Sequence, residues 1–108
     1  MKAYKLYNTA NLDSAFSVID LPEMEHIKTS HCFIKQSAPG AVYDWHPAPR
    51  VQYVITLKGS LEFTVTNGDT FIVRPGDVLL AADVLGVGHK WISIGEDGWE
   101  RMYVVLEA

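Results

Sequence analysis

The stretch Leu61-Glu-Phe-Thr-Val-Thr-Asn-Gly-Asp-Thr-Phe-Ile-Val73 predicts a β-hairpin. Leu61, Phe63 and Val65 alternate with polar residues, so one face of the first strand is apolar and the other is polar. Asn67-Gly68 marks the turn, because both residues tolerate the positive φ that a type I′ turn demands. This hairpin indicates a chain that folds as β-structure.

Short β-rich runs of the same kind recur along the chain, each ended by Gly, Pro, Asn or Asp, while signals for helices are almost missing. A length of 108 residues matches one hydrophobic core, and no linker or internal repeat divides it. We therefore expect a single all-β, antiparallel domain over residues 1–108. Its strands are predicted at Lys2–Tyr7, Phe16–Ile19, Cys32–Gln36, Ala41–Trp45, Val51–Leu57, Leu61–Thr66, Thr70–Val73, Asp77–Ala81, His89–Ile94 and Arg101–Leu106.

The composition is 48% hydrophobic and 20% charged, with a formal net charge of -4. Proteins that bind a phosphate backbone usually carry a basic stripe, and here Lys and Arg form no run. No apolar stretch approaches the roughly 20 residues of a membrane-spanning helix, and Met1–Asn8 lacks the apolar core of a signal peptide. We expect a cytoplasmic protein that binds neither nucleic acid nor membrane. Cys32, the only cysteine, forms no intramolecular disulfide and is expected to be buried as a small hydrophobe.

One group of residues has spacings that suggest a small metal or ligand site in a β-barrel: Gly40, His46, Gln52, Gly59 and His89. His46 and Gln52 are six residues apart, which would be roughly 20 Å in one straight strand. They share a ligand only if the chain reverses between them. Pro47-Ala48-Pro49 favours such a bend, because neither proline donates a ladder hydrogen bond. His46 is then expected to end one strand and Gln52 to begin the next, facing each other.

Strand alternation predicts which residues accompany these three. Asp44 and Val42 are expected on the face of His46, Val54 and Thr56 on the face of Gln52, and Trp91 and Ser93 on the face of His89. The predicted pocket is therefore His46, Gln52 and His89, with Asp44, Trp91 and Thr56 nearby. Two further residues are considered as possible members of the site. Asp83 is expected to form a turn, and Arg50 either lies on the surface or binds a substrate carboxylate through its planar fork.

These residues resemble the two motifs of the cupin superfamily. Gly40-x5-His46-x-Ala48-x3-Gln52-x6-Gly59 is similar to the first motif, in which His-x-His and a later Glu bind a metal. The segment from Gly76-Asp77 through His89 resembles the second, although its histidine comes two residues late, so the Val84–Gly88 loop is longer than in the family pattern. The likeness to short, stand-alone cupins covers about residues 30–106. It implies a double-stranded β-helix, or jelly roll, and commonly a homodimer.

The resemblance also implies a divalent metal ion (Fe, Mn, Ni, Cu or Zn) on His46, Gln52 and His89. Ala48 and Gln52 stand where the family has His and Glu, so the charge of the metal would be left uncompensated. That weakens affinity but strengthens Lewis acidity toward a bound anion; the same two changes also fit a protein without metal. Asp44 is predicted as the catalytic residue, acting as a ligand, a base or an anchor for an imidazole N–H, with a solvated turn aspartate as the alternative.

Three functions remain open at this point. The first is a metal-dependent enzyme that acts on a small organic molecule as a dioxygenase, isomerase, lyase or cyclase. The second is a metal-free isomerase or cyclase whose histidines serve directly as acid and base. The third is a cupin that binds or senses a small ligand without turnover. Fold alone does not choose among them.

Overall fold

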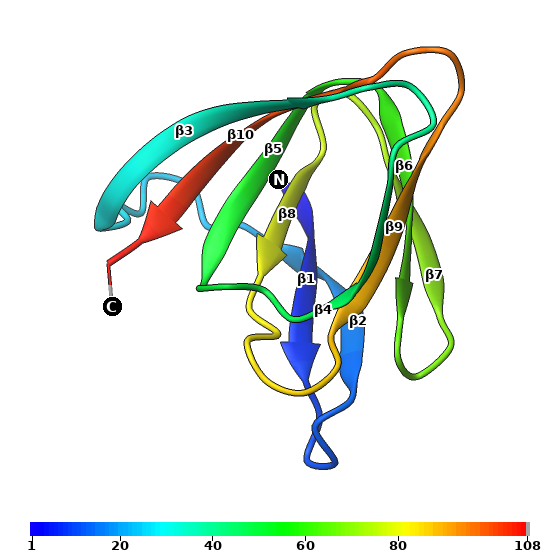
Figure 1. Ribbon diagram of the computed structural model, residues 1–108. Coiled ribbons are helices and arrows are strands. Elements are labelled where there is room, and N and C mark those ends of the chain that lie inside the picture. The colour runs from blue at the N-terminus through cyan, green and yellow to red at the C-terminus, as the bar shows by residue number, and fades with distance from the viewer. Residues whose placement is uncertain (108) are drawn as a thin grey trace.

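The structure is a computed structural model that describes residues 1–107. This part of the chain contains ten β-strands joined by turns and loops (Figure 1). All ten were predicted, with ends that differ by at most three residues, as where β3 begins at Thr29 instead of Cys32. No helix within residues 1–107 is long and apolar enough to cross a membrane. The strands are β1 (Lys2–Asn8), β2 (Ser14–Asp20), β3 (Thr29–Ser37), β4 (Val42–His46), β5 (Gln52–Lys58), β6 (Ser60–Val65), β7 (Thr70–Val73), β8 (Val78–Ala81), β9 (His89–Ile94) and β10 (Trp99–Leu106).

The strands form two sheets that face each other across a shared interior (Figure 1). One sheet has six strands in the order β2-β1-β8-β5-β10-β3, and the other has four in the order β4-β9-β6-β7. The prediction of an antiparallel domain is confirmed for every pairing but one, because β1 runs parallel to β8 with Tyr4 opposite Leu79. These two strands lie far apart in sequence, so no short hairpin forces them to be antiparallel.

The predicted hairpin joins β6 to β7, and its alternation builds the core. Leu61, Phe63 and Val65 are at most 2% exposed, while the residues between them are half-buried. Burying one such side chain stabilises the fold by about 1.5–3 kcal/mol. The predicted type I′ geometry of the turn is wrong, because Gly68 has a positive φ and Asn67 does not. The Asn67 side chain instead accepts a hydrogen bond from the Asp69 amide at 2.9 Å.

Gly88 brings β9 unusually close to β4. It has φ +89°, and a Cβ atom at this position would overlap the carbonyl oxygen of His46. Only glycine avoids both the strained conformation and the overlap. The backbone next to His89 therefore packs directly against the backbone of His46, which sets the spacing of the two histidines.

Strand β3 forms one edge of the six-stranded sheet and is exposed on both faces. The prediction that Cys32 is buried is wrong for this reason: no layer covers the strand, and the thiol is exposed. Ile34 is also 62% exposed. One face of β3 nevertheless borders the interior between the sheets, where Phe33 stacks on Tyr103 of β10 with ring centroids 4.9 Å apart.

Candidate functional site

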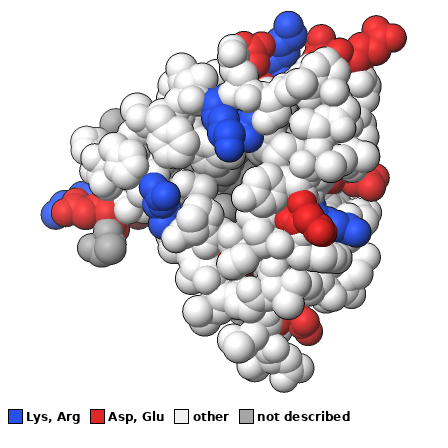
Figure 2. Space-filling view, viewed as in Figure 1, with Lys and Arg blue, Asp and Glu red and all other residues white. Residues whose placement is uncertain are grey.

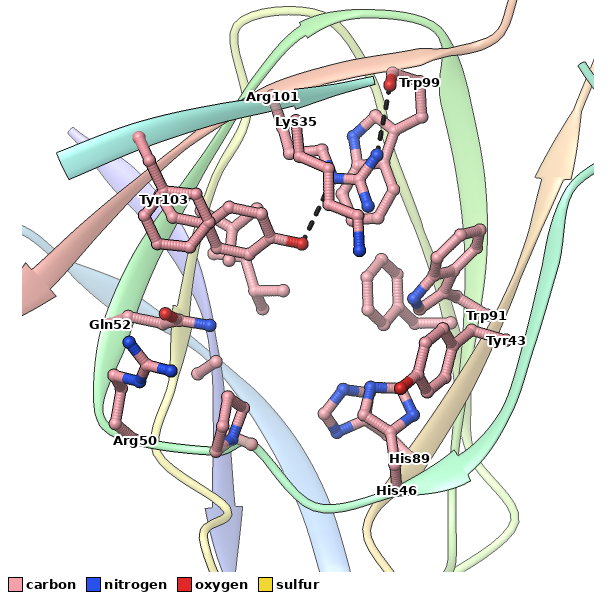
Figure 3. A pocket seen from close by; sticks show the side chains of 17 residues that line it. Lys35, Tyr43, His46, Arg50, Gln52, His89, Trp91, Trp99, Arg101 and Tyr103 are labelled. Atoms are coloured by element: carbon pink, nitrogen blue, oxygen red, sulfur yellow. Dashed lines mark hydrogen bonds between the residues drawn. The ribbon is translucent and has the colours of Figure 1, made fainter. Parts of the chain in front are cut away.

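A cavity of about 190 Å³ opens between the two sheets. Its walls are strongly aromatic, and Figure 3 shows the labelled side chains converging on it. The aromatic lining consists of Phe33, Tyr43, Phe63, Trp91, Trp99 and Tyr103. The polar and charged lining consists of Lys35, His46, Arg50, Gln52, His89 and Arg101. A cavity of this kind is where a small organic ligand binds in many proteins.

His46 and His89 lie side by side at one end of this cavity (Figure 3). They are cross-strand partners at the paired ends of β4 and β9, and their ring centroids are 4.5 Å apart. His89 is buried and His46 is half-buried. Two residues that the sequence placed in one pocket thus meet across a single pair of strands.

A hydrogen bond behind each ring fixes which ring nitrogen carries the proton. His46 Nδ1 donates to the carbonyl oxygen of Asp44 at 2.7 Å, and His89 Nδ1 donates to Oδ2 of Asp83 at 2.6 Å. A carbonyl and a carboxylate only accept, so the proton of each neutral ring sits on Nδ1. The lone pairs on both Nε2 atoms are therefore left for the cavity. Burial lowers the pKa of His46, and repulsion from His89 adds to this, against the raising effect of the Asp44 carbonyl.

Asp83 is completely buried, so the prediction of a turn former is wrong. Besides the bond to His89, its Oδ2 accepts a hydrogen bond from Ser14 Oγ at 2.7 Å, and its backbone carbonyl accepts from the Ala48 amide at 3.0 Å. The loop before His89 places this carboxylate behind the imidazole. The partner Ser14 is 69 residues away in sequence, and no local pattern pointed to it.

Asp44 does not share the face of His46, and the prediction that it points inward is wrong. Tyr43 pairs with Trp91 and His46 pairs with His89, so three residue steps in β4 oppose two in β9. This β-bulge shifts the alternation by one position. Tyr43 therefore faces the cavity beside His46, with ring centroids 4.0 Å apart. Asp44 is exposed, and its Oδ1 accepts a hydrogen bond from the adjacent Trp45 amide.

Gln52 lines the cavity but lies across it from the two histidines (Figure 3). After His46 the chain crosses through Pro47-Ala48-Pro49 from the four-stranded sheet to the six-stranded one (Figure 1). The bend predicted at the prolines exists, but it leads to the opposite wall. Gln52 is 5% exposed, and its Oε1 has no hydrogen-bond partner among the described residues. Ala48, at the position of the second family histidine, is buried against the cavity.

Of the other residues expected near the pocket, Trp91 and Arg50 line the cavity and Thr56 does not. Trp91 lines the cavity, with its ring centroid 4.9 Å from that of Trp99. Thr56, expected near the pocket, is buried behind the wall, where its Oγ1 accepts a hydrogen bond from Trp99 Nε1 at 3.2 Å. Arg50 is exposed, as one of its two expectations had it, and it also borders the cavity, while binding of a substrate carboxylate stays a prediction.

Arg101 is the main site residue that sequence reasoning missed. It is 2% exposed, lines the cavity, and lies over the ring of Trp99 at 3.9 Å. Its Nε donates to the Tyr103 hydroxyl at 3.1 Å, and its Nη1 donates to Ser37 Oγ at 2.7 Å and to the Trp99 carbonyl at 3.2 Å. One signal was available: in Trp99-Glu-Arg101-Met-Tyr103 the arginine occupies the same alternating face as two aromatic residues.

The charges of the cavity bear directly on metal binding. Lys35, Arg50 and Arg101 line it, and no Asp or Glu within residues 1–107 does. No cluster of three or more His, Cys, Asp or Glu in that range is placed to hold a metal ion. Two imidazoles fit a metal, but a distant amide and three cations fit a tightly held divalent ion poorly. The predicted set of His46, Gln52 and His89 stays a prediction.

Two facing sheets with histidines on β4 and β9 around a cavity define a cupin barrel. The chain belongs to the family of AraC-like ligand-binding domains, whose model matches residues 28–108. It is 30% identical over 71 residues to the phomopsin biosynthesis cluster protein C' of Diaporthe leptostromiformis, covering 65% of this chain and 36% of that protein. It is 31% identical over 71 residues to the cupin-domain-containing oxidoreductase fogC of Aspergillus ruber, covering 64% and 34%. The chain thus spans about a third of the length of these relatives.

Two solved structures are also similar. A cupin 2 conserved barrel domain protein from Leptotrichia buccalis has a TM-score of 0.49 at 15% identity, covering 98% of this chain and 73% of that one. A conserved protein of unknown function from Streptococcus pyogenes has a TM-score of 0.47 at 14% identity, covering 81% and 98%.

Proposed function

We propose that this chain binds a small organic molecule in the barrel cavity and exchanges a proton with it through His89 and His46, without a metal ion. The observation that carries the proposal is the 2.6 Å hydrogen bond between His89 Nδ1 and the fully buried Asp83 carboxylate. The family match to ligand-binding domains supports the binding part of the proposal. The reaction class is an isomerisation or cyclisation that begins with removal of a proton next to a carbonyl.

The dyad supplies the chemistry of a general base. The lone pair on His89 Nε2 accepts a proton from a C–H or O–H of the ligand, and the imidazolium that forms is stabilised by the Asp83 carboxylate. His89 Nε2 then returns the same proton to the product at another atom, which leaves both imidazoles neutral as they began. A correctly positioned base contributes about 10²- to 10⁴-fold to such a step. The aromatic walls lower the polarity around the imidazoles, which strengthens these electrostatic interactions.

A metal-dependent enzyme is the second candidate, and one observation favours it. Both Nδ1 atoms are held by oxygen acceptors, which is the usual arrangement behind metal-binding histidines. Gln52 would offer a neutral amide oxygen from across the cavity. The name of one relative, a cupin-domain-containing oxidoreductase, is compatible with this candidate.

Deuterium exchange separates the candidates. Untagged protein is incubated in D₂O with a panel of ketones and 2-oxo acids, and deuterium incorporation next to the carbonyl is followed by NMR, with and without a strong chelator. We expect catalysed exchange that survives chelation and falls at least about 100-fold in a His89→Asn variant. Exchange that stops on chelation and returns with Fe, Mn, Ni, Cu or Zn would support the metal-dependent enzyme instead. Binding without any exchange would leave a ligand-binding or sensing role.

We also propose that the chain forms a homodimer in the cytoplasm. The support for a dimer is the edge strand β3, whose unpaired backbone and exposed Ile34 favour pairing with another copy. Light scattering after size-exclusion chromatography tests it, since a dimer has twice the 12.1 kDa mass of one chain. A monomer at all concentrations would overturn this part alone.

A further inference from the structure

We infer that Arg101 and Lys35 form a carboxylate-binding subsite and that the ligand of the cavity is a small aromatic acid. The inference rests on the proposed function, because it names the class of molecule that the cavity takes. Figure 3 shows both cationic side chains reaching the cavity at the end away from His46 and His89. The ligand is thereby held by its carboxylate at one end and meets the two imidazoles at the other.

Arg101 carries a buried charge that no carboxylate in the described chain balances. It is 2% exposed and forms no ion pair within residues 1–107. Its hydrogen-bond acceptors are two hydroxyls and a carbonyl, all neutral. Guanidinium stays protonated in proteins, and buried charges are normally paired. The contact with Trp99 stabilises the cation but does not neutralise it.

The hydrogen bonds of Arg101 leave a specific part of the fork free. Nε and both hydrogens of Nη1 are used, while Nη2 has no partner among the described residues. Nη2 is also not among the buried polar atoms that lack a partner, so it reaches open space. Two N–H donors on a fixed, planar group suit the oxygens of a carboxylate.

Lys35 lies directly opposite Arg101 in the antiparallel pairing of β3 with β10. Like charges at opposed positions of a sheet destabilise the pairing. Lys35 forms no ion pair within residues 1–107 either, and it borders the same cavity. An anion bound between the two cations is attracted by both, and these attractions offset the repulsion between Arg101 and Lys35. Figure 2 shows Lys and Arg side chains flanking the hollow on this face of the molecule.

The size and walls of the cavity restrict the rest of the ligand. An apolar cavity of about 150 Å³ holds benzene, so one of about 190 Å³ takes a single substituted ring. Trp91 and Tyr103 line the cavity on opposite sides (Figure 3), where such a ring packs against them. At the far end the two free Nε2 atoms accept from a hydroxyl or an acidic C–H. The class is therefore an aromatic acid with a proton donor opposite its carboxylate.

Calorimetry with two matched probes tests the inference. 4-Hydroxybenzoate carries the proposed carboxylate, and 4-hydroxybenzamide has the same shape without the charge. We expect the acid to bind about 10- to 100-fold more tightly than the amide. Arg101→Gln should remove this preference, and Arg101→Lys should keep part of it. Arg74→Gln, an equal change of charge at an exposed turn, should leave both affinities unchanged.

The outcomes separate the two proposals. If neither probe nor the panel of ketones and 2-oxo acids binds, the cavity takes no such ligand and the proposed function itself fails. If acid and amide bind equally and Arg101→Gln changes neither, the carboxylate subsite is wrong while the proposed function stands. If Arg50→Gln abolishes the preference and Arg101→Gln does not, the anion lies at the other wall and the inference is overturned. If inorganic phosphate competes as well as the aromatic acid, the site holds a bare anion and the aromatic assignment is wrong. A thermal unfolding scan of the Arg101→Gln and Arg101→Lys variants shows whether each still folds, so that a lost preference is separated from a lost fold.

Discussion

Tyr43 and His46, three positions apart in β4, present their rings to the same cavity at a centroid distance of 4.0 Å. An uninterrupted strand would place them on opposite faces. The bulge between them therefore replaces an acidic side chain in the cavity by an aromatic one. Arg101 adds a positive charge that forms no ion pair within residues 1–107, so the cavity favours an anion over a cation.

Substitutions at the bulge test this arrangement. Asp44→Asn is expected to change ligand affinity and exchange rate by less than twofold, because the side chain is exposed and, within residues 1–107, hydrogen-bonds only to the Trp45 amide. Tyr43→Ala is expected to weaken 4-hydroxybenzoate about 2- to 10-fold through loss of an aromatic wall. Calorimetry on the two variants decides. A larger loss of affinity in Asp44→Asn than in Tyr43→Ala would contradict this arrangement and show that Asp44 contributes to the site.

The dyad behind the cavity gives a second prediction. Asp83→Asn keeps a side chain of the same shape but removes the charge that stabilises an imidazolium on His89. Deuterium exchange should fall at least about 100-fold, with little change in affinity for 4-hydroxybenzoate. Ser14→Ala, which removes a hydrogen bond to the same Oδ2, is the control. It should lower the free energy of unfolding by about 0.5–1.5 kcal/mol and slow exchange much less. Equal rates in Asp83→Asn and the wild type would refute the role of the dyad.

Acid is expected to weaken the fold through His46. Burial lowers the pKa of its imidazole below the ordinary 6.5. Between that lowered pKa and 6.5 the unfolded chain holds more protons on this residue than the folded chain, so stability is lost as pH falls through the window and gained as pH rises. Urea unfolding at several pH values measures the slope, and ¹H–¹⁵N spectra of the imidazole locate its titration. His46→Gln should flatten this part of the curve, and an NMR pKa above 6.5 would contradict the prediction.

Placing a histidine at position 48, where the first cupin motif has one, tests whether the cavity can be made to bind a metal ion. Ala48 borders the cavity near His46, so Ala48→His is expected to raise Zn²⁺ affinity at least about 10-fold by adding a third imidazole. The bulkier side chain should also cost about 1–3 kcal/mol of stability. Ala48→Leu adds similar bulk without a ligand atom and should bind Zn²⁺ as the wild type does. Competition with a chromophoric chelator measures each affinity. A wild type that already binds as tightly as Ala48→His would favour the metal-dependent enzyme.

The pairing of His46 with His89 was not predicted; their common pocket was inferred from the spacing of the motifs. Period-two patterning, with turn residues at the strand ends, was sufficient to predict the ten strands, because alternation is a local property. It failed at Asp44, since one inserted residue in β4 reverses every inference drawn from alternation. It failed at Gln52, because the direction in which Pro47-Ala48-Pro49 leads depends on where the other sheet lies.

Long-range contacts account for the other misses. Asp83 acquires its role from Ser14 and His89, and Arg101 from Ser37, 64 residues away. The burial of these two charged side chains depends on how distant strands close around them. Cys32 is exposed for the converse reason, because β3 ends the sheet and no other described strand covers the thiol.

The close approach at Gly88 has a practical consequence for mutational surveys of this chain. Any side chain there would push β9 away from the His46 carbonyl and separate the two imidazoles. Gly88 would then score as essential for activity although it contributes no side chain to the cavity. Loss-of-function data would rank Gly88 beside His89. The structure distinguishes the two, because Gly88 is needed for the close approach of two strands and His89 for its imidazole.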